Sequence, residues 1–306
     1  MVRRLERRSA RILAIILAFI MLGSIFAYIS GGGGVEKRET KMSFSMLEIA
    51  AYVPENAIFF YYNLTEYGAI LKKLGKNDPL VRYVEGYIDE ELNYAFTYYL
   101  NRRTVEFTRN IEDLLVVQIG DFHVYFINEK SSKVYFAKQS EQNIGNLSVK
   151  ISGVIALSED IHPLVIGYAP LVFEIVKNID ENRTENYEAY LSKFNETMIF
   201  SFFTFGNKTG KYLRFTQAEE SPVDFFFQAF RYNDTSKRYE KVWGIHFTEN
   251  YFFYDLNETE RDFEYYHFIN FEDGFSIAVM GDRNFSKVLN ANPNVIGFIM
   301  TETNES

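Results

Sequence analysis

The feature that most constrains this chain is an uninterrupted apolar run at residues 12–29, preceded by five arginines within residues 1–11. At 1.5 Å per residue, a helix made of this run spans about 27 Å, close to the roughly 30 Å hydrocarbon core of a membrane. Clustered arginines keep their side of a spanning helix in the cytoplasm. We therefore expect a cytoplasmic basic tail at residues 1–11, a transmembrane signal anchor at residues 12–30 and an extracellular C-terminal domain.

Two other interpretations of this segment stay open. A cleaved signal peptide has an apolar core of about 7–15 residues with small residues before the cut, whereas this run is longer and offers a poor cleavage site. A pilin-like leader needs a charged-Gly processing site, and no clear one precedes the run. Four glycines then open a flexible linker at residues 31–44, which we expect to hold the folded part off the membrane.

Charge and composition exclude several classes of function. The net charge of the chain is −9, and because residues 1–11 carry +4 and residues 31–41 carry +1, residues 42–306 carry −14. An acidic domain repels nucleic acid and anionic lipid, so we expect no nucleic acid as a partner. We expect contact with the membrane through the anchor. Cysteine is absent, which excludes disulfides, thiolate zinc sites, iron–sulfur clusters and an acylated lipoprotein cysteine.

Nine Asn-X-Ser/Thr triplets occur where chance predicts about two or three, and we expect them to carry N-glycans. The alternative is that Asn, Ser and Thr gather in turns because they hydrogen-bond to their own backbone. An anchored, glycosylated chain without cysteine and with little glutamine favours an archaeal cell surface. The candidate acceptors are Asn63, Asn146, Asn182, Asn195, Asn207, Asn233, Asn257, Asn284 and Asn304.

The abundance of aromatic residues, 30 Phe and 22 Tyr against one Trp, favours β-sheets, whose pleated faces accept rings. The stretch FNETMIFSFFTFGNKT at residues 194–209 alternates so that both of its faces are apolar, which is typical of a strand covered on both sides. We expect its two ends to reach the surface at Asn195 and Asn207. The faces are Met198, Phe200 and Phe202 on one side and Ile199, Phe203 and Phe205 on the other.

Three segments have the pattern of a strand followed by a helix, near residues 57–74, 164–194 and 275–290. Thr65 and Asp282 are the expected N-caps of the first and third helices. The recurrence suggests a loose internal duplication of a strand-helix unit. Between these units, turn signals predict three strands in residues 114–138, with the first turn at Gly120 and Asp121, and four strands in residues 224–271.

The longest expected helix begins near residue 79 and carries an apolar stripe that we assign to the core, with a docking face for a membrane subunit as the alternative. The stripe is Leu80, Val84, Tyr87, Ile88, Leu92, Ala95, Phe96 and Tyr99.

The fold class that follows is α+β: after the single transmembrane helix comes an extracytoplasmic mixed or antiparallel β-sheet domain with packed helices at residues 45–306. A polar stretch at residues 138–146 suggests two lobes, 45–140 and 147–306.

No catalytic, cofactor or metal motif is present in the sequence. The four histidines are isolated from one another, and no nucleophile elbow, phosphate loop or dinucleotide fingerprint occurs. Acidic clusters at residues 88–91, 158–160 and 271–274 lack calcium-loop spacing, so we expect solvated surface. Exposed Tyr and Phe strips are candidate contacts for sugars or peptides, whereas Trp243 is expected in the core.

We therefore expect no cofactor and a non-catalytic binding or scaffolding role in the cell envelope, with an envelope component or membrane protein as partner. Two alternatives stay open: an accessory subunit of a membrane complex, and an extracytoplasmic hydrolase that uses carboxylates. The sequence leaves enzymatic activity undecided and favours its absence.

Overall fold

The computed structural model describes residues 40–94, 105–107, 111–129, 134–185, 187–194, 198–210, 222–255 and 261–297. The predicted tail, anchor and most of the linker, residues 1–39, lie outside this part of the chain. Within the described ranges, no helix has the length and apolar character needed to cross a membrane. Thr40–Ser306 form one compact unit.

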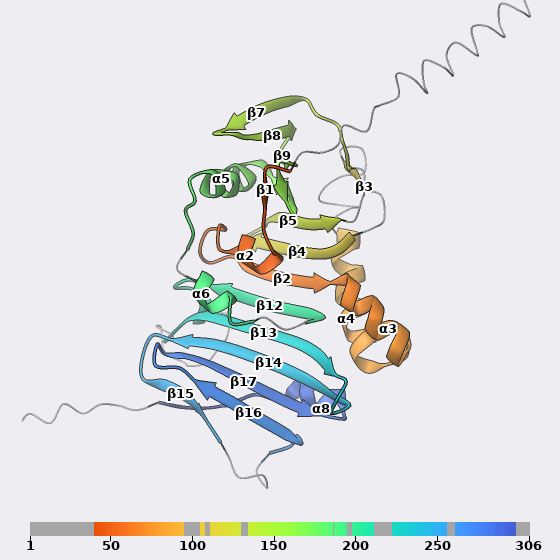
Figure 1. Cartoon of the computed structure of the whole chain (residues 1–306), viewed down its shortest axis with the longest axis vertical. Helices are drawn as coiled ribbons and strands as arrows, with labels where there is room; N and C mark the ends of the chain where they lie inside the picture. The colour runs from red at the N-terminus through yellow and green to blue at the C-terminus, as the bar shows by residue number, and fades with distance from the viewer. Residues whose placement is uncertain are drawn as a thin grey trace, which may run out of the picture. The chain divides into compact units, whose positions relative to one another are not determined.

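Twelve strands form one large sheet in which every neighbouring pair is antiparallel (Figure 1). The fold is thus α+β with a large antiparallel sheet and few helices. From one edge to the other the order is β16 (Tyr265–Asn270), β17 (Phe275–Asp282), β14 (Arg238–Phe247), β13 (Val223–Asn233), β12 (Phe200–Phe205), β2 (Ile58–Asn63), β4 (Ile111–Ile119), β5 (Phe122–Glu129), β11 (Leu164–Tyr168), β9 (Ile155–Ser158), β8 (Leu147–Ser152) and β7 (Ser140–Ile144).

Three short strand pairs accompany this sheet. β1 (Met42–Ser43) runs parallel to β10 (Ile161–His162). β3 (Val105–Phe107) pairs with β6 (Val134–Phe136), and β15 (Tyr251–Tyr254) pairs with β18 (Asn294–Gly297), both antiparallel. All the strands expected in residues 114–138 and 224–271 are therefore present.

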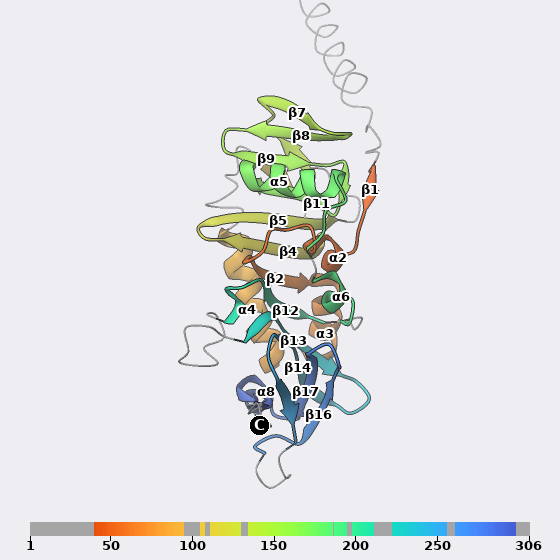
Figure 2. The same ribbon diagram turned by 90° about the vertical axis from the view of Figure 1, so that its left-hand side faces the viewer.

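Helices cover both faces of the large sheet. The α5 face carries α2 (Met46–Ala50), α5 (Ala169–Asp180) and α6 (Glu188–Leu191), and the α4 face carries α3 (Leu64–Leu74), α4 (Pro79–Asn93) and α8 (Phe285–Asn290). Figure 2 shows α4 on one side of the strands and α2 and α6 on the other. The β15–β18 pair adds to the α4 face, next to the edge strand β16.

The strand β12 confirms the expectation drawn from its alternating rings. Phe203 and Phe205 pack into the core of the α5 face, and Phe200 packs into that of the α4 face. Phe203 stacks on Phe59 of β2 with ring centroids 4.5 Å apart, and both rings are fully buried. Replacing such a buried Phe by Ala typically lowers the free energy of unfolding by about 3–5 kcal/mol. Phe202 departs from the expectation, because it is only partly buried. The expected faces of Met198 and Ile199 are wrong: both residues precede the strand, and Met198 packs into the α5 face while Ile199 packs into the α4 face.

The sheet divides at the junction of β12 and β2 into two runs of strands. Residues 58–168 supply seven strands on one side, and residues 200–282 supply five on the other. Outward from the junction, each side begins with one strand and a hairpin, followed by a strand that leads into a helix, α5 or α8. These two helices cover opposite faces. The polar stretch 138–146, expected between two lobes, contains the edge strand β7, and both suggested lobes contribute to the one sheet.

Candidate functional site

An open groove lined by aromatic rings lies on the α4 face, over β2, β12, β13 and β14. One part has a volume of about 340 Å³ and an adjoining part about 390 Å³, and the two share Phe60 and Tyr87. We call these parts together the aromatic groove. The first part is lined by Phe60, Tyr83, Tyr87, Phe200, Phe202, Phe226, Gln228 and Trp243, and the second by Phe60, Tyr62, Tyr87, Glu90, Glu91, Tyr94, Gln118 and His123.

The groove exists because two separate apolar clusters cover the α4 face. One cluster lies under α3, α4 and α8, and the other lies beside the β15–β18 pair. Tyr87, which the sequence placed in the core, is 39% exposed and stacks on Phe200 at 5.1 Å. The assignment of Tyr87 to the core is therefore wrong: α4 buries Leu80, Val84 and Ile88, while Tyr87 lines the groove. The remaining four stripe residues have no described side chains.

Few polar groups interrupt the rings of the first part. Trp243 is only 9% exposed, which confirms its predicted place in the core, although it also lines the groove. Its indole N–H donates to Gln228 Oε1 at 3.0 Å. Phe226 meets the Trp243 ring edge to face at 5.0 Å. Rings that are fixed against one another and partly open offer flat apolar surfaces for a ligand.

The second part carries the ionisable groups of the groove. Burial raises the pKa of the Glu91 carboxyl, the Tyr125 hydroxyl that donates to it at 3.4 Å lowers it, and the net pKa is above the usual range. Burial lowers the pKa of His123. Among the described lining residues there is no Lys or Arg, whereas Glu90 and Glu91 both line the second part. The arrangement fits a neutral ligand with flat apolar faces.

Two other hollows are larger but differ in chemistry. One of about 460 Å³ lies beside α8 and is lined mostly by polar and charged side chains, and one of about 520 Å³ lies between α2, α6 and the end of β2. Neither has the convergent rings of the aromatic groove. We therefore take the groove as the candidate binding site.

Six of the nine expected glycan acceptors lie in the described ranges, and three of these asparagines have structural roles. Asn195, Asn257 and Asn304 lie outside the described residues. Asn63 accepts the backbone N–H of Glu66 at 2.8 Å and caps α3, so the expected cap Thr65 is wrong. Asn284 accepts the N–H of Ser286 at 3.0 Å and caps α8 in place of the expected Asp282. Asn146 is exposed in the turn between β7 and β8, and Asn207 is exposed just after β12, where the sequence predicted that this strand reaches the surface.

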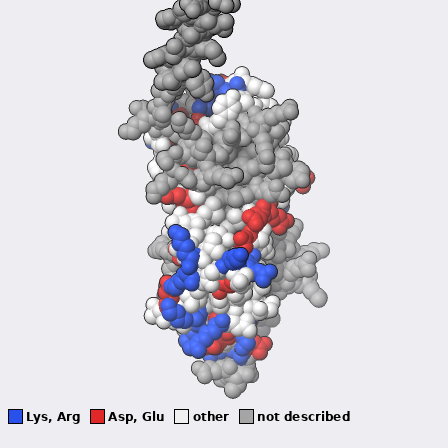
Figure 3. Space-filling view, turned by 90° about the vertical axis from the view of Figure 1, so that its right-hand side faces the viewer, with Lys and Arg blue, Asp and Glu red and all other residues white. Residues whose placement is uncertain are grey.

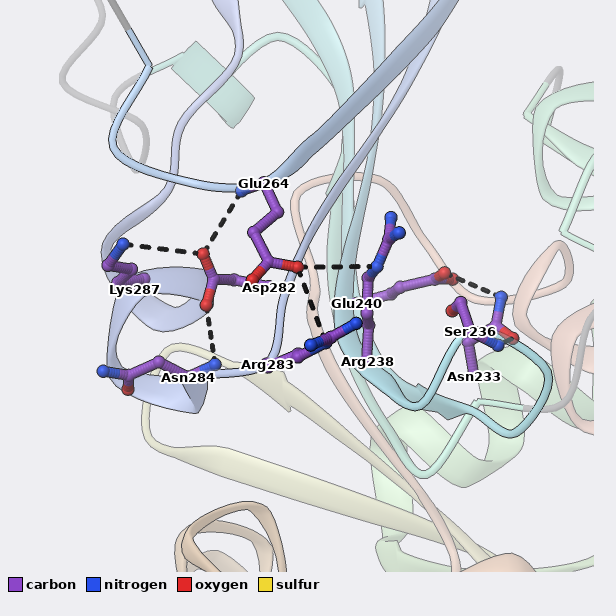
Figure 4. Close-up of polar contacts among 9 residues, drawn as sticks. All are labelled: Asn233, Ser236, Arg238, Glu240, Glu264, Asp282, Arg283, Asn284 and Lys287. Atoms are coloured by element: carbon purple, nitrogen blue, oxygen red, sulfur yellow. Dashed lines mark hydrogen bonds and ion pairs between the residues drawn. The ribbon is translucent and has the colours of Figure 1, made fainter. Parts of the chain in front are cut away.

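Asn233 closes the turn between β13 and β14 (Figure 4). Its Oδ1 accepts the backbone N–H groups of Thr235 at 3.0 Å and Ser236 at 3.1 Å, and its Nδ2 donates to Glu240 at 2.8 Å. Glu240 is only 3% exposed and also accepts from Arg231 Nε at 2.6 Å. One amide thus holds the turn and satisfies a buried carboxylate.

Asp282, at the end of β17, organises the neighbouring chain. It is 3% exposed and accepts the backbone N–H groups of Asn284 at 2.6 Å and Glu264 at 3.2 Å. Lys287 lies 3.7 Å away, and Glu264 lies within 4 Å of the guanidinium groups of Arg238 and Arg283. Figure 3 shows that basic and acidic side chains lie close together on this side of the molecule. Opposite charges are paired here, and this region is structural.

The four histidines stay apart, in β5, β10, β14 and β16. Within the described ranges, no group of three or more His, Asp or Glu side chains is placed to hold a metal. His246 Nδ1 lies 2.5 Å from Asp224 Oδ1, and its Nε2 lies 2.9 Å from the Asp273 carbonyl, which belongs to the third acidic cluster. Asp160 of the second acidic cluster accepts from Lys41 and from the Ser148 N–H. Asp160 and Asp273 were expected to be solvated surface residues, but both also make contacts that hold the fold together.

Comparisons with known proteins give a family. The family model AF_2048_N, described as a family N-terminal domain, matches residues 43–180, which end with α5. A protein of Archaeoglobus fulgidus named "Uncharacterized protein" is 40% identical over 304 residues, covering 97% of this chain and 96% of that protein.

Solved structures give only distant likenesses. Crystal form III of TP0453 covers 80% of this chain and 98% of its own, with 9% identity and a TM-score of 0.36. Crystal form I of TP0453 covers 80% and 96%, with 11% identity and a TM-score of 0.33. Likenesses this distant carry no argument about function.

Proposed function

This chain belongs to the family whose N-terminal domain is named AF_2048_N, and we propose that it is a membrane-anchored, extracytoplasmic protein that binds an envelope component in its aromatic groove. The binding is non-catalytic in this proposal. The ligand is uncharged and presents flat apolar faces, as a saccharide ring does. The single observation that carries the proposal is the groove itself, with its fixed, partly open rings.

The chemistry of the groove supports this ligand class. Small-molecule sites are concave, mostly apolar and carry a few polar groups that fix orientation, and here Gln118 and Gln228 supply such groups. Glu90 and Glu91 lie at one end, where they would repel an anion. The acidic charge of residues 42–306 adds to this preference and disfavours nucleic acid.

The proposed location rests on the sequence. The apolar run at residues 12–29 with its arginine cluster supports a single-pass anchor with the N-terminus in the cytoplasm. The excess of Asn-X-Ser/Thr triplets supports a glycosylated, extracellular domain. We also propose an internal duplication, but only of the order of the strands. The helices do not follow it, because α5 and α8 cover opposite faces of the sheet.

The binding proposal is tested with Trp243, the only tryptophan in the chain, which lines the groove. We expect neutral oligosaccharides to change its fluorescence in a saturable manner when added to the full chain in detergent. Tyr87→Ala removes an exposed groove ring and should weaken binding at least about tenfold, which corresponds to roughly 1.4 kcal/mol. Tyr135→Ala removes a 66% exposed ring that is not among the groove residues and should leave binding unchanged.

Two results would contradict this proposal: no saturable signal from any neutral saccharide, or equal affinities in the Tyr87→Ala variant and the wild type. Crosslinking in native membranes followed by mass spectrometry tests the alternative of an accessory subunit. Stoichiometric recovery of one membrane complex would favour that alternative.

A carboxylate-dependent hydrolase is the second candidate function, favoured by the raised pKa of Glu91 inside the groove. A rise in the pKa of a carboxyl moves it toward the range in which it can act as a general acid. The test is release of sugar from a bound neutral oligosaccharide by the full chain. Hydrolysis that is lost in Glu91→Gln, while Trp243 still reports binding, would replace the binding proposal by this one.

A further inference from the structure

The described Asn-X-Ser/Thr triplets differ sharply in how they are presented. Within the described ranges, the triplet of Asn182, Arg183 and Thr184 is the only one whose three residues are all exposed. It follows the end of α5 and lies in neither a helix nor a strand. Asn182 has a φ of 49°, a left-handed conformation that asparagine tolerates better than most residues.

The side-chain amide of Asn182 is held by its oxygen alone. Oδ1 accepts from the Tyr52 hydroxyl at 3.1 Å, and among the described residues Nδ2 makes no hydrogen bond. Nδ2 is the atom to which a glycan is attached. The residue is therefore oriented by one contact while its reactive nitrogen stays available at the surface.

Each of the other five described triplets has at least one residue that the fold covers. Asn63 and Asn233 are themselves partly buried, and the amide nitrogen of Asn233 is bound to Glu240. In the remaining three the covered residue follows the asparagine. These residues are Leu147 at 1% exposed, Thr209 at 0% and Phe285 at 4%.

We propose that Asn182 is the asparagine that is glycosylated in the folded domain, and that Asn233 is a structural residue that carries no glycan. This proposal rests on the extracytoplasmic location proposed above. In the transfer, Nδ2 of Asn182 bonds to the anomeric carbon of an oligosaccharide carried on a lipid phosphate. The bond from that carbon to the phosphate oxygen breaks, the phosphate leaves with the electron pair, and the amide gives up one proton.

The position of this glycan fits the proposed binding site. α5 covers the α5 face of the sheet, whereas the aromatic groove lies on the α4 face. A sugar chain after α5 therefore stands on the opposite face of the sheet from the groove, where its bulk shields surface without closing the groove.

The test uses the full chain made in an archaeal host that glycosylates proteins, purified from membranes and analysed by glycopeptide mass spectrometry. We expect a glycan on the Asn182 peptide of most molecules and none on the Asn233 peptide. Thr184→Ala should abolish the first modification, and Thr184→Ser should retain it, because the triplet then stays intact. Thr184 is exposed and makes no side-chain hydrogen bond within the described ranges. The fluorescence of Trp243 verifies that the variants are folded.

The proposal is overturned if the Asn182 peptide is bare, or if the Asn233 peptide is modified to the same extent. Labelling of intact cells with an impermeant reagent tests the extracytoplasmic location separately from the choice of Asn182 as the acceptor. A domain labelled from outside with a bare Asn182 overturns the choice of acceptor and leaves the proposed location standing. A domain that is protected in intact cells and labelled only after lysis overturns both.

Discussion

Asn233→Ala should lower the free energy of unfolding by about 2.5–3 kcal/mol, because one side chain closes a turn and satisfies a buried carboxylate. The two bonds that Asn233 Oδ1 accepts in the turn resemble an N-cap, whose loss costs about 1 kcal/mol. The bond to Glu240, 2.8 Å long, involves a charged acceptor, for which about 1.5–3 kcal/mol is typical. Arg231 still pairs with Glu240 at 2.6 Å in the variant, so we take the lower half of that range.

Urea unfolding of the full chain in detergent measures this change, with Trp243 as the probe. Trp243 lies on β14, which pairs with β13 up to the turn that Asn233 closes, so its signal reports unfolding of this part of the sheet. The midpoint should fall while the slope of free energy against urea stays the same. Fluorescence that falls with two transitions would mean that the sheet unfolds in parts.

Thr235→Ala is the matched control. Thr235 is exposed and bonds to Asn233 through its backbone N–H, which the substitution keeps. Its effect should stay below about 0.5 kcal/mol. The control also removes the glycosylation triplet, so it separates loss of the asparagine contacts from loss of a glycan. Equal stabilities of Asn233→Ala and Thr235→Ala would refute the reasoning, because the turn and Glu240 would then not depend on this amide.

Two further predictions concern pH and packing. Burial lowers the pKa of His246, but the hydrogen bond and charge of Asp224 outweigh it and the net pKa is raised. This contribution to stability is full below the unfolded pKa of about 6.5 and is lost as pH rises through the higher folded pKa. Asp224→Asn should therefore reduce the fall of the unfolding free energy as pH rises above about 6.5. An unchanged slope would contradict this. A Cβ on Gly167 would lie 2.4 Å from the carbonyl oxygen of His123, so Gly167→Ala should cost about 3 kcal/mol in urea unfolding. Gly86→Ala, in open space inside α4, should instead raise the free energy of unfolding by up to about 1 kcal/mol.

Local pattern was enough to predict most of the secondary structure. Alternating rings in residues 200–205 specify a strand with two buried faces, because side chains of a strand point alternately to opposite sides. The strands and helices that similar periodicities predicted occur in the predicted order, but the three strands β7, β8 and β9 in residues 140–158 were not predicted. The four-residue helix α6 falls short of the longer helix expected there. The predicted caps Thr65 and Asp282 each lie two residues from the observed caps, Asn63 and Asn284, because several neighbouring side chains are able to cap a helix.

The sequence by itself determined that this chain builds an α+β domain rich in aromatic residues, and it supplied the candidate glycan acceptors. Only the tertiary structure decided that Tyr87 opens onto a groove, because its exposure depends on where α4 crosses a sheet assembled from strands far apart in the chain. The same holds for the asparagines. All Asn-X-Ser/Thr triplets have the same pattern in the sequence, so the sequence does not distinguish them. Folding gives Asn233 a contact from its amide nitrogen to Glu240, whereas Asn182 is contacted by Tyr52 at its amide oxygen.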